Sequence, residues 1–297
     1  MSRIQDLLNK AERDGTARRT RGLGEDAIAA ATPPPPREAG RTAPPAWAAR
    51  PSAASRTATL EPPVTEHFPS AVALDQRLVA ALAPQSLPAE QYRSLRTRIK
   101  LAENGRGMRA IAVTSPGKGD GKSLTAANLA LTMAQEFQQR VLLLDADLRR
   151  PAAHQLFGIA NTPGLADVLA GTADLEQALV SLPEYHVAVL PAGAPPGHPA
   201  ELLGSLAMRR VFDTLRTRFD RILVDLPPVA PLADVHIVSP LVDGLLMIVR
   251  AGVTPKPAIE QALSGLDASK VLGLVLNEAG EATPPGYAYE GYGYLAG

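Results

Sequence analysis

A glycine-rich stretch at residues 115–123 carries the residue types that bind phosphate. It reads Ser-Pro-Gly-Lys-Gly-Asp-Gly-Lys-Ser, follows an apolar run and precedes a helical one. Glycines let consecutive backbone N–H groups curl around a phosphate, and the N-terminus of the next helix adds a partial positive charge. Lys122 is expected to reach the β- and γ-phosphates, and the Ser123 hydroxyl to bind Mg²⁺. The residues expected to line a nucleotide are Gly117, Lys118, Gly119, Asp120, Gly121, Lys122, Ser123 and Leu124.

The loop departs from the usual GxxxxGK[ST] pattern at one place, where Pro116 replaces the first glycine. The proline removes one N–H that could face a phosphate, but the rest of the turn remains rich in glycine. The loop therefore still predicts a nucleotide site, although it does not specify the reaction.

Two other apolar runs end in carboxylates. Residues 141–144 are followed by Asp145 and Asp147, and residues 222–224 are followed by Asp225. Ligands of open parallel sheets bind at the carboxyl ends of the strands, so these side chains should share an edge with the glycine loop. A lone aspartate after a strand often caps a helix instead. Buried charges need a compensating cation, however, and Mg²⁺ takes one or two carboxylates together with phosphate oxygens.

The elements that must position these residues alternate along the chain. We expect strands near 109–115, 140–146, 186–191, 221–226, 244–250 and 270–277, and helices near 89–101, 122–137, 199–219, 231–239 and 256–267. Apolar strands separated by helices predict an α/β P-loop NTPase fold with a mostly parallel, doubly wound sheet. We expect this domain to span residues 88–280.

The remaining segments have different compositions. Residues 1–14 have apolar positions at helical spacing and predict an amphipathic helix, whereas residues 15–87 are rich in proline and alanine and predict a disordered linker. Thirty basic residues balance thirty acidic ones, which gives no reason to expect a nucleic-acid partner. The chain has no cysteine and no apolar run long enough for a membrane helix, so we expect a cytoplasmic protein.

The motifs together resemble those of the bacterial tyrosine kinases, or BY-kinases, of exopolysaccharide and capsule synthesis. The resemblance covers about residues 66–297 and includes Asp147-Leu148-Arg149-Arg150-Pro151, Gly164-Leu165-Ala166-Asp167-Val168-Leu169, Leu190-Pro191-Ala192-Gly193 and Glu201-Leu202-Leu203. It implies a MinD/ParA-like fold and ATP as the nucleotide. It also implies catalytic roles for Lys122, Asp145, Asp147 and Asp225. In these roles, Ser123 and Asp147 hold Mg²⁺, Asp225 supports the metal shell and Asp145 is the base.

One helix carries Glu90, Arg93 and Arg96 at intervals of three residues, which places them on one face. A solvated charged face is the simplest interpretation. The resemblance, however, implies that this Glu-x-x-Arg-x-x-Arg motif joins subunits of a ring, so we expect a homo-oligomer. It also implies a membrane adaptor of the chain-length-determinant type that activates the protein and recruits it to the inner membrane, and a tyrosine phosphatase as a further partner.

Four of the six tyrosines lie in the last eleven residues, among glycines: Tyr287, Tyr289, Tyr292 and Tyr294. Tyrosines two apart could belong to an edge strand, but the glycines and the preceding prolines weaken that interpretation. We expect residues 281–297 to form a flexible tail of phosphoacceptors. If the last strand is parallel to the others, the tail leaves the fold at the nucleotide edge. Roughly 15 residues could extend about 50 Å, far enough to reach a neighbour's site.

Two alternatives to a tyrosine kinase that phosphorylates its own tail remain open. A MinD/ParA-like positioning ATPase would share the fold, but its signature lysine falls where this chain has Gly117. A non-catalytic adaptor that binds ATP only to assemble would not need the complete set of acidic residues. Relatives of the nitrogenase iron protein are excluded because the chain has no cysteine.

Overall fold

The computed structural model describes residues 73–136 and 139–279. The helix expected at 1–14, most of the linker expected at 15–87 and the tyrosine tail lie outside these residues. None of the helices in the described part of the chain is long and apolar enough to span a membrane.

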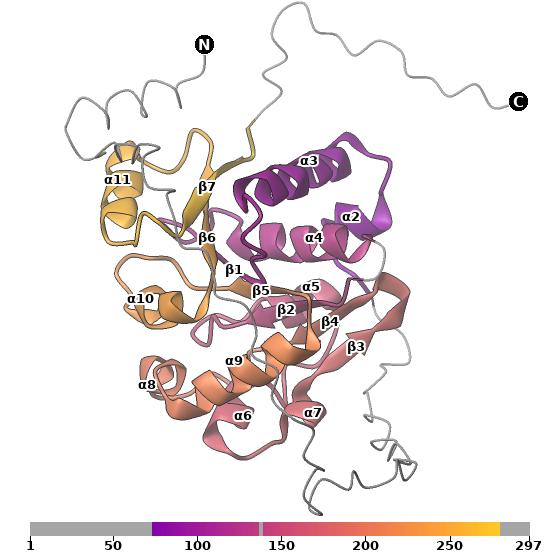
Figure 1. The fold of residues 1–297 in the computed structure, drawn as a ribbon, viewed down its shortest axis with the longest axis vertical. Coiled ribbons are helices and arrows are strands. Elements are labelled where there is room, and N and C mark those ends of the chain that lie inside the picture. The colour runs from indigo at the N-terminus through magenta and orange to yellow at the C-terminus, as the bar shows by residue number, and fades with distance from the viewer. Residues whose placement is uncertain (1–72, 137–138, 280–297) are drawn as a thin grey trace, which may run out of the picture. The chain divides into compact units, whose positions relative to one another are not determined.

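A seven-stranded sheet forms the centre of the described fold (Figure 1). The strands are β1 (Ala110–Thr114), β2 (Val141–Asp145), β3 (Val180–Leu182), β4 (Val187–Leu190), β5 (Arg221–Asp225), β6 (Gly244–Arg250) and β7 (Val271–Asn277). Their order is β3-β4-β2-β5-β1-β6-β7, and every neighbouring pair is parallel except β3 and β4. The predicted strands and the mostly parallel sheet are confirmed. Only β3 was not predicted, because three residues are too few to show an alternating pattern.

The helices are more numerous than predicted, and those that match a predicted helix are shorter than it, except α3, which is longer than the range 89–101. They are α2 (Val79–Leu82), α3 (Leu87–Ala102), α4 (Lys122–Ala134), α5 (Ala153–Phe157), α6 (Leu165–Ala170), α7 (Leu175–Ala178), α8 (Pro199–Leu203), α9 (Leu206–Arg218), α10 (Asp234–Val238) and α11 (Lys256–Ser264), with 3₁₀ turns at Pro183–Tyr185 and Ser239–Leu241. The single helix predicted at 199–219 is divided into α8 and α9 at Gly204. Ser205 starts α9 by accepting a hydrogen bond from the Met208 N–H at 3.2 Å.

Helices cover both faces of the sheet (Figure 1). Helices α3 and α4 pack on one face and α6, α8 and α9 on the other. In β1, Ile111 and Val113 face the core on the α3 and α4 side, whereas Ala110 and Ala112 face the core on the α6, α8 and α9 side. This alternation follows from the two-residue period of a strand. The central strands are thus buried on both sides, which explains why they are continuous apolar runs, whereas β7 at the edge is only partly buried.

The described fold begins earlier than the predicted domain boundary at residue 88. Helix α2 lies within the stretch predicted to be linker, and Leu78, which precedes it, is fully buried. The Ala80 N–H donates to Asn128 Oδ1 at 3.0 Å, and the Asp75 N–H donates to the Leu156 carbonyl at 2.9 Å. The prediction of disorder is therefore wrong for residues 73–87. Its error has a simple cause: nearby prolines obscured the few apolar residues that pack against α4.

Candidate functional site

The glycine loop connects β1 to α4 and has the backbone conformation that its glycines allow. Gly119 and Gly121 have φ values of 87° and 93°, in the left-handed region that other residues rarely adopt. A Cβ atom on Gly121 would lie 2.0 Å from Asn277 Nδ2. Gly121 is therefore required both by its backbone conformation and by the close approach of the end of β7.

Asp120 braces this loop from inside. Its Oδ2 accepts the Gly117 N–H at 2.9 Å, and its Oδ1 accepts the Thr254 hydroxyl at 2.7 Å. Its backbone carbonyl accepts Asn277 Nδ2 at 2.9 Å. The side chain is buried, so Asp120 supports the loop with its carboxylate, while the loop's backbone remains the candidate surface for phosphate.

Thr254 and Asn277 were not identified from the sequence. Asn277 does carry a weak signal, since it is a polar residue at the end of the last apolar strand. Thr254 carries none, because its role depends on a contact with a residue 134 positions earlier.

Lys122 brings the expected site residues together. Its Nζ lies 2.8 Å from Asp147 Oδ2, 3.4 Å from Asp225 Oδ1 and 3.2 Å from Ser123 Oγ. Burial alone would lower the pKa of Lys122, but the charges of Asp225 and Asp147 outweigh it and raise that pKa. The lysine is therefore a fixed positive charge held between the ends of α4, β2 and β5.

Asp145 is fully buried at the end of β2, opposite Asp225 in the ladder. Its Oδ1 accepts the Asp147 N–H at 3.1 Å, and its Oδ2 accepts the N–H groups of Ala152 and Ala153 at 3.0 Å each. Burial raises the pKa of Asp145 to about 7, and the nearby Asp225 carboxylate adds to this shift while the Ala153 and Ala152 N–H groups oppose it. Asp145 thus holds the loop that carries Asp147.

Asp225 supplies the observation that bears on a metal ion. Burial raises its pKa, and the charge of Lys122 opposes that shift. Within the described residues, its Oδ2 is buried without a hydrogen-bond partner. A buried carboxylate oxygen without a donor is costly unless a cation binds it. Together with the Ser123 hydroxyl and Asp147, this donor set suits Mg²⁺, which prefers oxygen ligands.

A second ion pair fixes the segment after β2. Arg149 donates from Nε to Asp234 Oδ2 at 2.7 Å and from Nη2 to Asp234 Oδ1 at 3.0 Å. Asp234 is fully buried at the start of α10, and the Asp147 Oδ1 accepts the Arg150 N–H at 3.0 Å. This two-point contact ties the Asp147 loop to α10. Asp234 was not singled out from the sequence, because its partner is distant along the chain.

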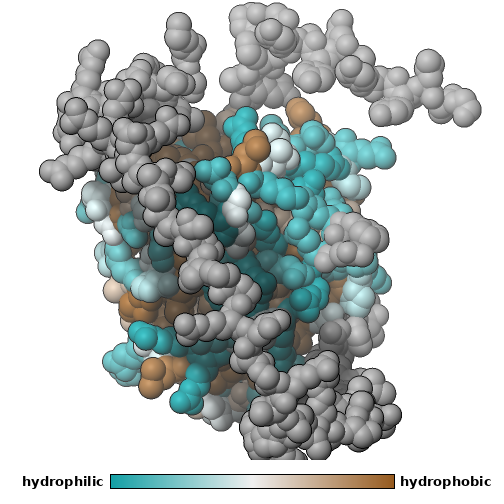
Figure 2. Space-filling model, viewed as in Figure 1, coloured by the Kyte–Doolittle hydropathy of each residue, from teal (hydrophilic) through white to brown (hydrophobic). Residues whose placement is uncertain are grey.

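The residues expected to join subunits lie on α3, outside the site formed by Lys122 and the aspartates. Arg93 pairs with Glu90 and donates to the Pro84 carbonyl, whereas Arg96 contacts α4. Hydrophilic side chains dominate the surface around α3 (Figure 2). The four tail tyrosines lie outside the described residues. The tail was expected to leave the fold at the nucleotide edge if the last strand is parallel to the others. Strand β7 is indeed parallel to β6, and its last residue, Asn277, contacts the glycine loop.

Comparison with known proteins adds an independent finding. Residues 111–283 match the family described as the CobQ/CobB/MinD/ParA nucleotide binding domain. The chain is 38% identical over 220 residues to the tyrosine-protein kinase YwqD of Bacillus subtilis, which covers 73% of this chain and 92% of YwqD. It is 36% identical over 201 residues to the succinoglycan biosynthesis transport protein ExoP of Rhizobium meliloti, which covers 66% of this chain but 25% of ExoP.

A solved structure agrees with these matches. The kinase domain of the Escherichia coli tyrosine kinase ETK is similar with a TM-score of 0.66 and 28% identity. The similarity covers 72% of this chain and 84% of that domain.

Proposed function

The chain belongs to the family of bacterial tyrosine-protein kinases, and we propose that it uses Mg-ATP to phosphorylate tyrosines of its own C-terminal segment. The proposed acceptors are Tyr287, Tyr289, Tyr292 and Tyr294. One observation carries the proposal: Lys122, Asp147 and Asp225 meet at the sheet edge where β7 ends. The Asn277 side chain contacts the glycine loop there, so the segment that follows starts beside the proposed phosphate site.

The chain's own residues would act mainly by positioning charge. Transfer of a phosphoryl group passes through a loose transition state, so neutralising its charge contributes more than base strength. The loop amides and Lys122 would bind the β- and γ-phosphates, and Ser123, Asp147 and Asp225 would hold Mg²⁺. The metal, when bound, supplies positive charge to the phosphate oxygens. Lys122 would exchange its contact with Asp147 for a phosphate oxygen when the nucleotide enters.

Asp145 is the proposed base for the tyrosine proton. A phenol has a pKa of about 10 and must lose this proton during transfer. The raised pKa of Asp145, about 7, suits a carboxylate that accepts a proton near neutral pH. Its Oδ2 already accepts two backbone N–H groups but its Oδ1 accepts only one, so Oδ1 keeps a lone pair for the proton. Asp145 would therefore combine two roles, orienting Asp147 and accepting the proton.

The names of the relatives support a proposal for the biological setting. ExoP is named for succinoglycan biosynthesis and transport, which supports a role in exopolysaccharide polymerisation or export. We propose that the protein works as a ring on the cytoplasmic side of the inner membrane, where a chain-length-determinant-type adaptor activates it and a tyrosine phosphatase resets it. Each added phosphate brings about −1.5 to −2 charges, and the resulting repulsion would loosen the ring.

The experiment compares two products of the purified full-length chain with Mg-ATP, with and without an adaptor. Phosphotyrosine that accumulates with ADP supports the kinase. ADP release with no phosphotyrosine, even with the adaptor present, would instead identify a positioning ATPase of the MinD/ParA type, which the matched nucleotide-binding family also includes.

A further inference from the structure

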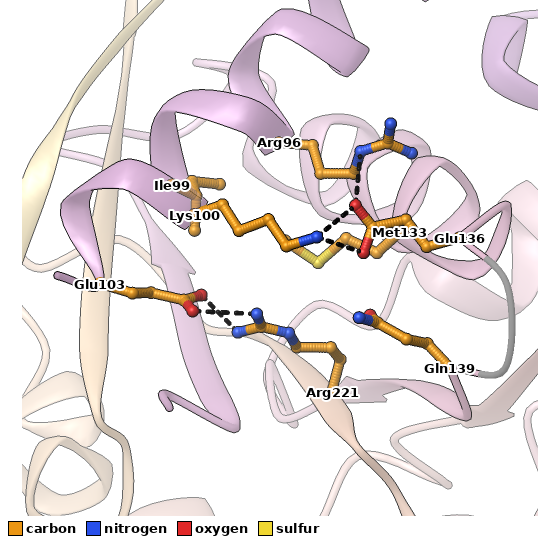
Figure 3. Close-up of a pocket in the computed structure, with 8 residues that line it drawn as sticks. All are labelled: Arg96, Ile99, Lys100, Glu103, Met133, Glu136, Gln139 and Arg221. Carbon is orange, nitrogen blue, oxygen red and sulfur yellow. Dashed lines mark hydrogen bonds and ion pairs between the residues drawn. The ribbon is translucent and has the colours of Figure 1, made fainter. Parts of the chain in front are cut away.

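Arg96 on α3 points into the fold, toward the end of α4 (Figure 3). Its Nη1 donates to the Thr132 carbonyl at 2.6 Å, and its Nε lies 3.3 Å from Glu136 Oε1. Lys100, one turn further along α3, donates to both oxygens of Glu136 at 3.0 and 3.1 Å. Two cations of α3 therefore converge on the C-terminal end of α4.

This contact is favourable for a specific reason. The last carbonyls of a helix lack partners within the helix and carry a partial negative charge, so nearby cations stabilise them. Arg96 supplies a charged donor to one of those carbonyls, and Glu136 holds the arginine in place. Only about a fifth of each side chain is exposed, 21% for Arg96 and 20% for Glu136, so solvent screens this pair less than an open surface pair.

The charged residues around Arg96 connect α3 to α4 and β5, and the space between them is too small for a ligand. The hollow between them holds about 10 Å³, enough for a single water molecule. On its other side, Glu103 follows α3 and pairs with Arg221, whose Nη2 lies 3.0 Å from Glu103 Oε2 (Figure 3). Arg221 begins β5, and β5 ends at Asp225. Helix α4 likewise begins at Lys122. Both elements that hold α3 thus lead directly to the nucleotide site.

The other two charged residues of the α3 motif differ from Arg96. Glu90 and Arg93 pair with each other near the start of the helix, with 64% and 31% of their side chains exposed. Leu87 and Leu101, at the two ends of α3, are 66% and 75% exposed. Glu90 and Arg93 contact each other and the segment before α3, so their outer surfaces remain available to a second copy of the chain, whereas Arg96 is engaged with α4.

We propose that Arg96 is a positioning residue within its own chain: with Glu136, it fixes α3, and hence the exposed Glu90–Arg93 pair, to the helix that begins at the phosphate loop. The inference rests on the proposed function in one respect, that α3 is the face on which subunits meet. Its consequence is that removal of Glu136, which lies outside the charged motif of α3, weakens assembly in the same way as removal of Arg96.

The test uses hydrogen exchange of the full-length chain at the Gln135 and Glu136 amides, which bond to the last turn of α4. Arg96→Ala and Glu136→Ala should each speed exchange about 10- to 150-fold, the range for one hydrogen bond to a charged group. Arg96→Ala/Glu136→Ala should exceed the faster single variant by little, because each single change already removes the Arg96–Glu136 contact. Arg98→Ala, an exposed arginine on the same helix, is the matched control and should leave exchange unchanged.

Assembly size by light scattering and tail phosphorylation complete the test. Arg96→Ala and Glu136→Ala should reduce both, whereas Arg93→Ala should reduce both with normal exchange. If Arg96→Ala disrupts assembly with normal exchange while Glu136→Ala is silent, Arg96 contacts a neighbour directly and the proposal is wrong. Glu136→Gln gives the same comparison if the alanine variant folds poorly. A wild-type chain that makes no phosphotyrosine would refute the proposed function but would leave the exchange result standing.

Discussion

Thr254→Val tests whether the hydrogen bond between Thr254 and Asp120, which holds the phosphate loop, contributes to nucleotide affinity. The substitution keeps the shape of the side chain but removes the hydroxyl that donates to Asp120 Oδ1 at 2.7 Å and accepts the Arg250 N–H at 2.9 Å. Losing a hydrogen bond to a buried carboxylate costs about 1.5–3 kcal/mol. Because Asp120 Oδ2 also holds the Gly117 N–H, a loosened carboxylate frees the phosphate loop itself.

The loss of nucleotide affinity in Thr254→Val depends on the fraction of molecules whose phosphate loop keeps the conformation that binds nucleotide. If a braced loop is the competent state, a loss of about 2 kcal/mol lowers apparent affinity by up to about 30-fold. Calorimetric titration of the full chain with Mg-ATP measures this directly. Thr254→Ser retains the hydroxyl and should bind nearly as tightly as the wild type. Equal affinity for Thr254→Val and wild type would refute the argument that the brace prepares the loop.

Three further predictions concern the same sheet edge. Asp225→Asn should abolish the extra stabilisation by Mg-ATP in thermal unfolding, because it removes a carboxylate of the proposed metal site; an unchanged shift with Mg-ATP would contradict that role. The pKa of Asp145 is about 7 in the folded protein and about 3.9 unfolded, so the folded state binds more protons between these values. Stability without nucleotide should therefore fall as pH rises from about 4 to 7, measured by denaturant unfolding at each pH; a flat profile would contradict the shift. Gly121→Ala should abolish nucleotide binding, and Asn277→Ala in the same chain should relieve the clash at 2.0 Å but not the strain of a positive φ, which leaves binding only partly restored.

The sequence predicted the features that depend on neighbouring residues. The glycine loop, Lys122 and the aspartates after β2 and β5 each occupy one short stretch, and their meeting follows from the shared edge of a parallel sheet. Contacts between distant segments could not be read in this way. Asp234 and Thr254 act through partners 85 and 134 positions away, and neither lies in a recognisable pattern.

Arg96 shows a different limit of sequence reasoning. Residues three apart on a helix differ by about 60° around its axis, so Glu90 and Arg96 are about 120° apart. One end of the motif therefore faces solvent while the other reaches α4, although the three residues appear to share a face. Helix α2 was missed because its four residues stand near prolines. Its order depends on the burial of Leu78 and on a hydrogen bond that the Ala80 N–H donates to Asn128 Oδ1.

The most direct test of the central claim maps phosphate onto the chain by mass spectrometry. The full-length protein and Lys122→Met are expressed and purified side by side, and every tyrosine is quantified. We expect phosphate on Tyr287, Tyr289, Tyr292 or Tyr294 of the wild type and none on the Lys122→Met tail. Phosphate confined to other positions, or equal tail phosphorylation in both proteins, would contradict the link between the Lys122 edge and the C-terminal tyrosines.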